Sequence, residues 1–323
     1  MTLFENLKLF PKIDLHIDFL GSVTKDTIYN LTSEFVSQEE INSIVEFDSL
    51  TNYDNSKILA SKLLNSLDNI EIATKDLIEK LKKDNLIYGE IFINLDLFLK
   101  NLNKQEIIKT ILKVIKKSGI ELNLVLEIDS SIKKEDMYNN LNILYGFYKK
   151  GINGVLFRKS KFENLDSYQA LFDKFIKDKI DYFVLLDSKI TNQNKEIYYN
   201  AKRIIYNLFE EPSDNFLNII RENEIILEFP ITYQSYFNLY DDLSNHFVYD
   251  LYKENVKIAF TTLDMTLLDT DLLNEYCKLF NVFPFNLHDL VVINLNILNR
   301  LNVKDIVKNN LIEEFKEKAN ELL

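Results

Sequence analysis

Short apolar runs alternate along the chain with longer segments that have helical spacing. The runs are rich in β-branched, aromatic and leucine residues and cover 12–19, 88–94, 122–129, 154–158, 182–187, 203–207, 225–229 and 257–262. Several are nearly continuous in apolar residues, which is typical of parallel strands buried on both faces. Between most of them, as in 103–119, apolar residues recur at i, i+3 and i+4, which indicates amphipathic helices.

The alternation of strands and helices predicts right-handed crossovers and a parallel sheet. About eight such units in 323 residues predict an α/β protein with a (β/α)8 TIM barrel, and a doubly wound open sheet is the alternative. Residues 20–87, between the first two runs, are long enough to hold several extra helices. Because no repeat or linker interrupts the sequence, we expect a single domain over residues 1–323.

Polar side chains follow the predicted strands at their C-terminal ends, where barrels of this kind carry their active sites. His16 and Asp18 are two residues apart, so their side chains project from the same face of a strand, as metal ligands would. The predicted ring at these ends consists of His16, Asp18, Phe92, Asp129, Arg158, Lys159, Asp187, Lys189, Tyr206, Glu228 and Asp264.

Composition narrows the classes of function. The formal net charge of -12 and the sequence pI of about 4.9 disfavour nucleic-acid binding, because an acidic surface repels phosphates. No apolar run approaches the roughly 18 residues of a membrane span. The single cysteine, Cys277, excludes an intrachain disulfide, and the N-terminus lacks signal-peptide features, so we expect a cytoplasmic protein. The last glycine is Gly154, which excludes a glycine-rich phosphate loop beyond it.

Four segments resemble a known family. The opening, FPKIDLHIDFLGSVTKDTIYNL, is similar to that of adenosine deaminases, where Pro-Lys precedes a strand with His-x-His, followed by Gly-Ser and a helix beginning with Thr. YGEIFIN, ILEFPITYQ and the stretch from LSNHF to LLNEY resemble later segments of the same family. The resemblance covers most of the chain. It implies a zinc-dependent (β/α)8 hydrolase of purine nucleosides.

Most catalytic positions of that family are changed in this sequence. By the resemblance, His16 matches the first zinc ligand and Asp18 takes the place of the second. Further along the chain, the third zinc-binding histidine of the family falls on Leu186, and its zinc-binding aspartate falls on Leu263, with Asp264 as the acidic neighbour. The family's proton-shuttling glutamate falls on Lys189, and its water-orienting histidine falls near Tyr206. A glycine that contacts substrate in the family falls near Lys159. We therefore expect no cofactor, since the ligands of the family's zinc are largely missing.

Three hypotheses follow. The first is an adenosine-deaminase-like pseudoenzyme that binds a small molecule at the barrel mouth, such as a purine nucleoside, or a protein. The alternative is an active hydrolase or deaminase of purine nucleosides or related substrates with a rebuilt carboxylate-rich metal site, for which magnesium or manganese would be preferred. The third is a structural subunit, either a homo-oligomer or the partner of an active paralogue.

Each hypothesis selects residues from the predicted ring. Candidate catalytic residues are Asp264, Glu228 and Lys189. Candidate ligand-binding residues are His16, Asp18, Lys159, Asp187 and Tyr206. A metal would use His16, Asp18 and Asp264; without one, His16 is expected to hydrogen-bond to Asp18, Asp187 or Asp264.

Overall fold

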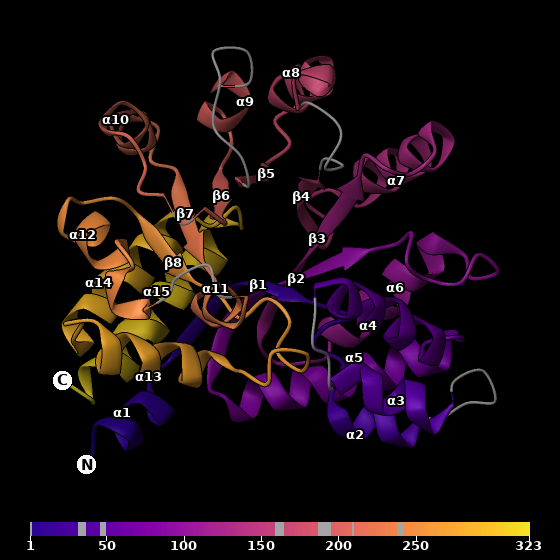
Figure 1. The fold of residues 1–323 in the computed structure, drawn as a ribbon, viewed down its shortest axis with the longest axis horizontal. Helices are drawn as coiled ribbons and strands as arrows, with labels where there is room; N and C mark the ends of the chain where they lie inside the picture. Colours follow the sequence, from indigo (N-terminus) through magenta and orange to yellow (C-terminus); the bar gives the residue numbers. More distant parts are fainter. Residues whose placement is uncertain are drawn as a thin grey trace.

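The computed structural model describes residues 2–31, 37–45, 50–158, 165–186, 195–208, 210–237 and 242–323. Its strands form one sheet in sequential order in which every neighbouring pair is parallel. They are β1 (Lys12–Asp18), β2 (Leu86–Asn94), β3 (Glu121–Asp129), β4 (Ile152–Arg158), β5 (Tyr182–Leu186), β6 (Arg203–Tyr206), β7 (Ile226–Phe229) and β8 (Ile258–Phe260). This order confirms the (β/α)8 TIM barrel and excludes the doubly wound sheet (Figure 1).

The barrel closes through the segment that follows β8. Leu263 forms a parallel bridge with Ile17; its N–H donates to the His16 carbonyl at 2.9 Å, and its carbonyl accepts from the Asp18 N–H at 2.8 Å. Leu263 has a φ of 53°, in the left-handed region that non-glycine residues rarely adopt. This turn brings the next residue, Asp264, to the end of β1.

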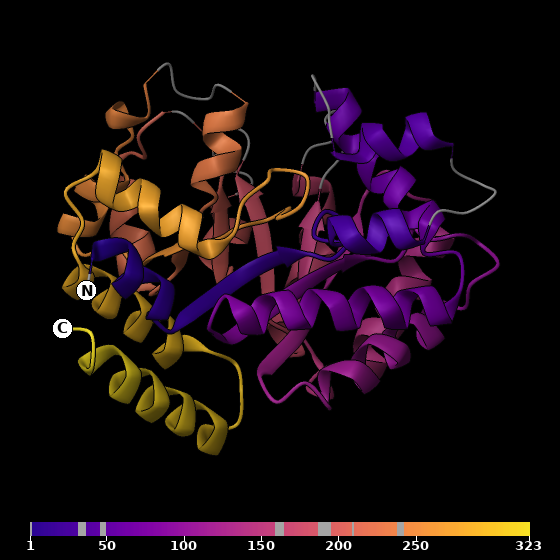
Figure 2. The same ribbon diagram turned by 90° about the horizontal axis from the view of Figure 1, so that it is seen from below.

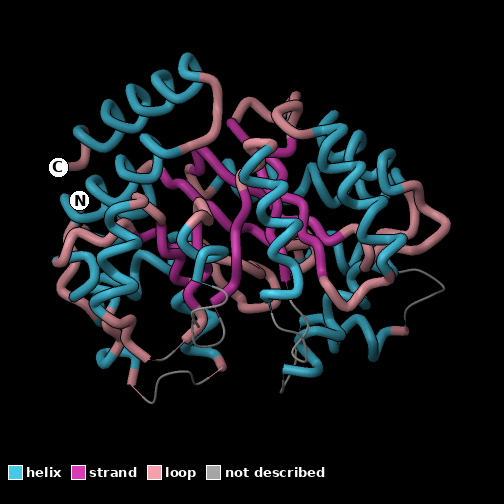
Figure 3. The backbone as a smooth tube through the Cα atoms, turned by 90° about the horizontal axis from the view of Figure 1, so that it is seen from above, coloured by secondary structure: helices cyan, strands magenta, loops and turns pink. Residues whose placement is uncertain are grey.

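Helices surround the strands (Figure 3). Four of them, α2 (Lys25–Asn30), α3 (Gln38–Val45), α4 (Leu50–Leu63) and α5 (Leu67–Lys83), fill the connection between β1 and β2, which confirms the predicted extra helices. The others are α1 (Leu3–Leu9), α6 (Lys104–Ile115), α7 (Lys134–Phe147), η1 (Leu165–Tyr168), α8 (Gln169–Lys177), α9 (Lys195–Tyr199), α10 (Asp214–Glu222), α11 (Ile231–Tyr236), η2 (Leu243–Asn245), α12 (Val248–Lys253), α13 (Leu272–Val282), α14 (Leu287–Arg300) and α15 (Asp305–Asn320).

The chain ends meet on one side of the barrel. Helix α1 contacts α13, and the two termini lie near each other beside the C-terminal helices (Figure 2). No helix in the described ranges is long and apolar enough to cross a membrane.

The core has two parts because successive strand residues face opposite sides of the sheet. In β1, Ile13, Leu15 and Ile17 pack in the large core shared with the helices. A smaller apolar cluster, which we call the barrel plug, fills part of the interior and consists of Phe92, Val125, Leu156, Phe183 and Ile205, with Leu185 packed against it. Polar side chains of β1, β2, β6 and β7, with others from β3, also face the interior and take part in the ionic groups described next.

Candidate functional site

Two aspartates and a lysine form an ionic cluster at the barrel mouth. The Lys57 Nζ lies 3.0 Å from Asp18 Oδ2 and 2.8 Å from Asp264 Oδ1. The Tyr53 hydroxyl donates to Asp264 Oδ2, and the Gly21 N–H donates to Asp18 Oδ1 at 2.7 Å. These side chains come from β1, from the segment after β8, and from α4. We call Asp18, Tyr53, Lys57 and Asp264 the mouth cluster.

A glycine permits this close approach. A Cβ atom at Gly21 would overlap the Asp264 carboxylate. Gly21 follows β1 closely, so the same tight turn that offers its N–H to Asp18 leaves room for Asp264. The glycine of the Gly-Ser pair in the opening segment is therefore required by the geometry of the mouth.

The two carboxyl groups of the mouth cluster differ in electrostatic environment. Burial, and then the negative charge of Asp18, raise the pKa of Asp264 well above its ordinary range. Burial also opposes the charge of Asp18, but the Lys57 ammonium and the Gly21 N–H outweigh it and lower the pKa of Asp18. Asp18 is therefore the member that stays ionised, while Asp264 favours its protonated form.

A second ionic network lies within the barrel. Arg203 of β6 pairs with Glu90 at 2.5 Å and with Glu228 at 2.9 Å, and the other Glu228 oxygen lies 3.2 Å from His16 Nδ1. The exposed fraction of these side chains is at most 6%. The guanidinium also lies 3.9 Å from the centre of the Phe183 ring, a cation–π contact. We call Arg203, Glu90, Glu228 and His16 the interior network.

His16 belongs to the interior network and not to the mouth cluster. Its ring stacks on Phe92 of the barrel plug, with 3.6 Å between ring centroids. The expectation that Asp18 or Asp264 holds this ring is wrong, because the carboxylate at its Nδ1 is that of Glu228. Glu228, predicted as a catalytic candidate, is fully buried between His16 and Arg203.

Other members of the predicted ring lie elsewhere. Tyr206 faces away from the barrel interior: it is buried, its ring packs against Phe229 and Phe247, and its hydroxyl donates to the Glu210 carbonyl. The structure therefore corrects its predicted place at the mouth. Arg158 lies 3.3 Å from Glu127. Lys159, Asp187 and Lys189 lie outside the described residues.

Sequence reasoning did not select four of the residues that build these two networks. Glu90 and Arg203 are single charges inside otherwise apolar strands, YGEIFIN and RIIY, and that contrast is a usable signal of a buried ion pair. Tyr53 and Lys57 belong to α4, whose sequence carries no comparable signal.

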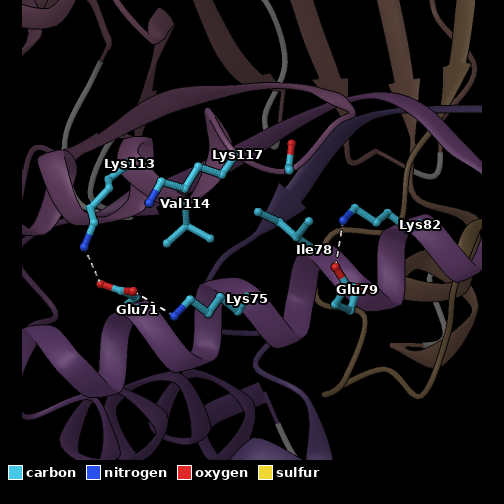
Figure 4. Close-up of a pocket in the computed structure, with 9 residues that line it drawn as sticks. Glu71, Lys75, Ile78, Glu79, Lys82, Lys113, Val114 and Lys117 are labelled. Carbon is cyan, nitrogen blue, oxygen red and sulfur yellow. Dashed lines mark hydrogen bonds and ion pairs between the residues drawn. The ribbon is translucent and has the colours of Figure 1, made fainter.

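A separate surface cavity of about 250 Å³ lies between α5 and α6 (Figure 4). Lysines and glutamates dominate its lining, and Glu71 pairs there with both Lys75 and Lys113. None of its lining residues belongs to the mouth cluster or to the interior network. The mouth is therefore the candidate site, and this cavity is a solvated groove.

Similar proteins point to one family. No family model matches the chain. An adenosine deaminase of Clostridium perfringens is 25% identical over 312 residues, which cover 90% of this chain and 93% of the relative. Among solved structures, Arabidopsis ADAL complexed with IMP is 16% identical with a TM-score of 0.86, covering 99% of this chain and 100% of that one. An amidohydrolase of Burkholderia ambifaria with bound Zn is 16% identical with a TM-score of 0.84, and the match covers 100% of this chain and 95% of that one.

The expectation that the protein has no cofactor is wrong by this comparison. The zinc-bound amidohydrolase and the relatives named adenosine deaminase point to a zinc cofactor. The side chains in their observed arrangement do not fit the ion, however. The described ranges contain no group of three or more His, Cys, Asp or Glu side chains that could hold a metal, and Lys57 is paired with both mouth carboxylates.

Fold and sequence similarity agree over nearly the whole chain. The relative covers nine tenths of it, and the solved structures cover almost all of it with the same arrangement of strands and helices. The chain therefore resembles adenosine deaminases in sequence and has the fold of the adenosine-deaminase-like metal-dependent hydrolases.

Proposed function

We propose that the protein is a hydrolase of the adenosine deaminase type that acts on a purine nucleoside or nucleotide at the barrel mouth. The observation that carries this proposal is the pair of buried carboxyl groups, Asp18 and Asp264, joined by Lys57 at the C-terminal ends of the strands. This is the end of the barrel at which TIM-barrel enzymes bind substrates. The relative named adenosine deaminase and the IMP complex support a purine ligand.

The chemistry of deamination needs an acid and a base. Water adds to the ring carbon that bears the amino group, a ring nitrogen takes a proton, and ammonia then leaves. A protonated Asp264 can donate the proton to the ring nitrogen, and an ionised Asp18 can accept one from water. Asp18 can then pass its proton to the departing amino group, and Asp264 can take up the proton of the new hydroxyl group, so that both carboxyl groups return to their starting states. Their pKa values are displaced in opposite directions, which is the usual signature of an acid and base pair.

Lys57 favours a second candidate function, ligand binding without turnover. Its ammonium contacts one oxygen of each carboxylate, and the Gly21 N–H and the Tyr53 hydroxyl occupy the other two. Carboxyl groups whose oxygens are all engaged by protein donors are less available to exchange protons with a bound purine as acid and base. Under this alternative the mouth recognises the ligand and leaves it unchanged.

Turnover assays separate the two. Purified full-length protein is incubated with adenosine and with AMP, and ammonia release is followed in parallel with the ultraviolet spectrum of the purine. Asp264→Asn removes the proposed acid. Asp269→Asn is the matched control, because Asp269 lies in the same loop with its side chain 84% exposed and paired only with Lys25 among the described ion pairs.

We expect turnover by the wild type and by Asp269→Asn, and at least a hundredfold loss in Asp264→Asn, the usual contribution of general acid catalysis. Turnover that survives Asp264→Asn would contradict the role of that residue. Saturable binding of adenosine or IMP by calorimetry, with no ammonia released, would establish the binding function instead.

A further inference from the structure

Glu275 is a fully buried carboxyl group that lies outside both ionic groups described above. It stands in the first turn of α13, a helix that packs against α11. Its Oε2 accepts from the Thr232 N–H at 3.0 Å, and its Oε1 accepts from the Thr232 hydroxyl and, at 2.9 Å, from the Thr270 hydroxyl. One side chain of α13 therefore joins the beginning of α11 to the segment that follows β8.

Thr270 ends the segment that carries Asp264. The Thr270 N–H donates to the Met265 carbonyl and the Leu268 N–H donates to the Asp264 carbonyl, both at 2.9 Å, so the segment folds back on itself as a compact turn. Its beginning is fixed to the chain after β1, because the Gly21 carbonyl accepts from two N–H groups of the turn. Its end is held, through the Thr270 hydroxyl, by the carboxyl group of α13.

Thr232 leads back to Asp264 by a second route. The next residue of α11 is Tyr233, whose ring packs edge-on against that of Tyr53 with 5.9 Å between the ring centroids. The Tyr53 hydroxyl donates to Asp264. Glu275 thus closes a circuit of contacts that starts and ends at Asp264. One arm holds the backbone segment of this aspartate, and the other holds the ring that donates to its carboxyl group.

A carboxylate suits this junction. Its two oxygens offer about four acceptor positions and no donor, so a single side chain can serve donors from two segments. Burial raises the pKa of Glu275, but the nearby Lys278 charge and the threonine donors oppose the shift. The Lys278 ammonium donates to the Thr232 hydroxyl, which in turn donates to Glu275, so the cation supports the junction without taking a carboxyl oxygen.

We propose that Glu275 is a positioning residue for the mouth cluster, which keeps Asp264 within reach of Tyr53 and Lys57. In the described structure, Glu275 acts on Asp264 only through Thr270 and Thr232. The inference rests on the proposed function only where turnover is concerned, because Asp264 is the proton donor proposed there. The geometry of the mouth cluster itself is measured without turnover.

Four variants test the circuit. Thr270→Val cuts the arm that holds the Asp264 segment, because valine has the shape of threonine and lacks the hydroxyl donor. Thr270→Ser keeps that donor and is its matched control. Glu275→Gln disturbs both arms, since the amide nitrogen of glutamine cannot accept a hydrogen bond. Glu90→Gln is the control for lost stability: the same substitution is made at a carboxylate that is 5% exposed and belongs to the interior network.

Two measurements on the full-length proteins report the position of Asp264. Hydrogen exchange with mass spectrometry follows the backbone amides of residues 264–270. Acetic anhydride modifies amines, and Lys57 is protected from it while Asp18 and Asp264 both hold its ammonium. Urea denaturation of each protein gives its stability, so that a displaced mouth is distinguished from a less stable fold.

We expect Thr270→Val to speed the exchange of residues 264–270 at least about fivefold, the factor that one net hydrogen bond contributes, and to increase the acetylation of Lys57. Glu275→Gln should have the larger effect on both. Thr270→Ser should match the wild type, and Glu90→Gln should lower stability and leave both readouts unchanged.

Unchanged acetylation of Lys57 in Thr270→Val overturns the proposal, and this variant decides alone if Glu275→Gln does not fold. The proposal also fails if Thr270→Ser behaves like Thr270→Val, or if Glu90→Gln exposes Lys57 as much as Glu275→Gln does.

Turnover separates this inference from the proposed function. If the wild type deaminates adenosine or AMP, Glu275→Gln should lower kcat about tenfold or more with little change in KM, because the acid is displaced from the reacting atoms. Increased acetylation of Lys57 with an unchanged kcat would contradict the catalytic role of Asp264 and support the positioning role of Glu275. Absence of wild-type turnover rejects deamination, and the exchange and acetylation results still decide on Glu275.

Discussion

The interior network and the mouth cluster are both buried ionic groups, but they are built differently. Arg203, Glu90, Glu228 and His16 all stand on strands of the barrel. The mouth cluster joins β1 and the segment after β8 to α4, a helix of the inserted connection. The first is fixed by the register of hydrogen-bonded strands, whereas the second also requires that α4 is docked.

This difference indicates which of the two ionic groups can exchange its contacts and which one mainly affects folding. Removing one charge from the interior leaves its buried partner unpaired, which is strongly destabilising. At the mouth, Lys57 stands on α4, outside the hydrogen-bonded sheet, so replacing its contacts breaks no strand pair. We therefore expect the interior variants to affect folding most and the mouth variants to affect binding most.

The largest effect is expected from Arg203→Met. The substitution leaves Glu90 and Glu228 buried without their cation, which should lower the free energy of unfolding by about 3–5 kcal/mol. Urea denaturation measures it. Arg221→Met is the control, because Arg221 and its partner Glu254 are 30% and 51% exposed and the pair should contribute less than about 1 kcal/mol. Equal effects of the two variants would remove the distinction between interior and surface.

The next effect concerns Asp14, which faces the interior beside His16. Burial raises the pKa of Asp14 from 3.8 to about 7, against hydrogen bonds from the Thr262 hydroxyl and the His16 N–H. Because the folded-state pKa lies above the unfolded value, the stability that the neutral carboxyl contributes is present below pH 3.8 and is lost as the pH rises through 7. The loss amounts to at most about 4 kcal/mol.

Asp14→Asn tests this directly. Unfolding free energies are measured between pH 4 and 8 for both proteins. The unfolding free energy of the variant should increase relative to that of the wild type as the pH rises to 7. The control is Asp250→Asn, which removes an exposed carboxylate of α12. Parallel profiles for the wild type and Asp14→Asn would show that the interior does not hold a neutral carboxyl.

Gly21→Ala should have an intermediate effect, at the mouth. The added Cβ would overlap the Asp264 carboxylate, so the mouth must shift, at a cost of about 1–3 kcal/mol. Gly146→Ala is the matched control. Among the described residues, no atom outside its chain neighbours and the backbone of its own helix lies within 4 Å of the Cβ position there. Alanine is favoured over glycine in α7 by up to about 1 kcal/mol. Thermal unfolding followed by circular dichroism should show opposite signs for the two variants.

The smallest effect is expected from Tyr53→Phe. It removes one hydroxyl donor from Asp264 and keeps the ring, which packs edge-on against Phe237. We expect a loss of about 0.5–1.5 kcal/mol in urea denaturation. Tyr138→Phe, at a ring that is 66% exposed, is the control. A larger loss than that of Arg203→Met would mean that the mouth, and not the interior, sustains the fold.

The strands could be read from the sequence because continuous apolar runs leave few alternatives. Each predicted run agrees with its strand to within two residues at either end. One helix boundary differed: the pattern at 103–119 predicts a helix to Gly119, but α6 ends at Ile115. Gly119 has a φ of 82° and lies in the turn that leads to β3. Apolar spacing reports the buried face of a helix and is less informative about its last turn.

The candidate site could be read only in part. Asp18 and Asp264 were expected at strand ends and do meet, although they lie 246 positions apart in the sequence, because Leu263 returns the chain to β1. The sequence pattern predicts Tyr206 at the mouth because Tyr206 ends a strand. The position at a strand end, however, does not decide which face of the sheet its side chain takes. Its neighbour Ile205 faces the barrel plug, so Tyr206 faces the helices.

The sequence by itself determined the barrel, the inserted helices after β1 and the resemblance to adenosine deaminases, because periodicity and local motifs are properties of neighbouring residues. Only the tertiary structure decided which charges pair. His16 met Glu228 instead of an aspartate, and Lys57 of the insertion took a position between Asp18 and Asp264. The physical reason is that ion pairing depends on a few ångströms between side chains distant in sequence, and sheet register and helix docking set those separations.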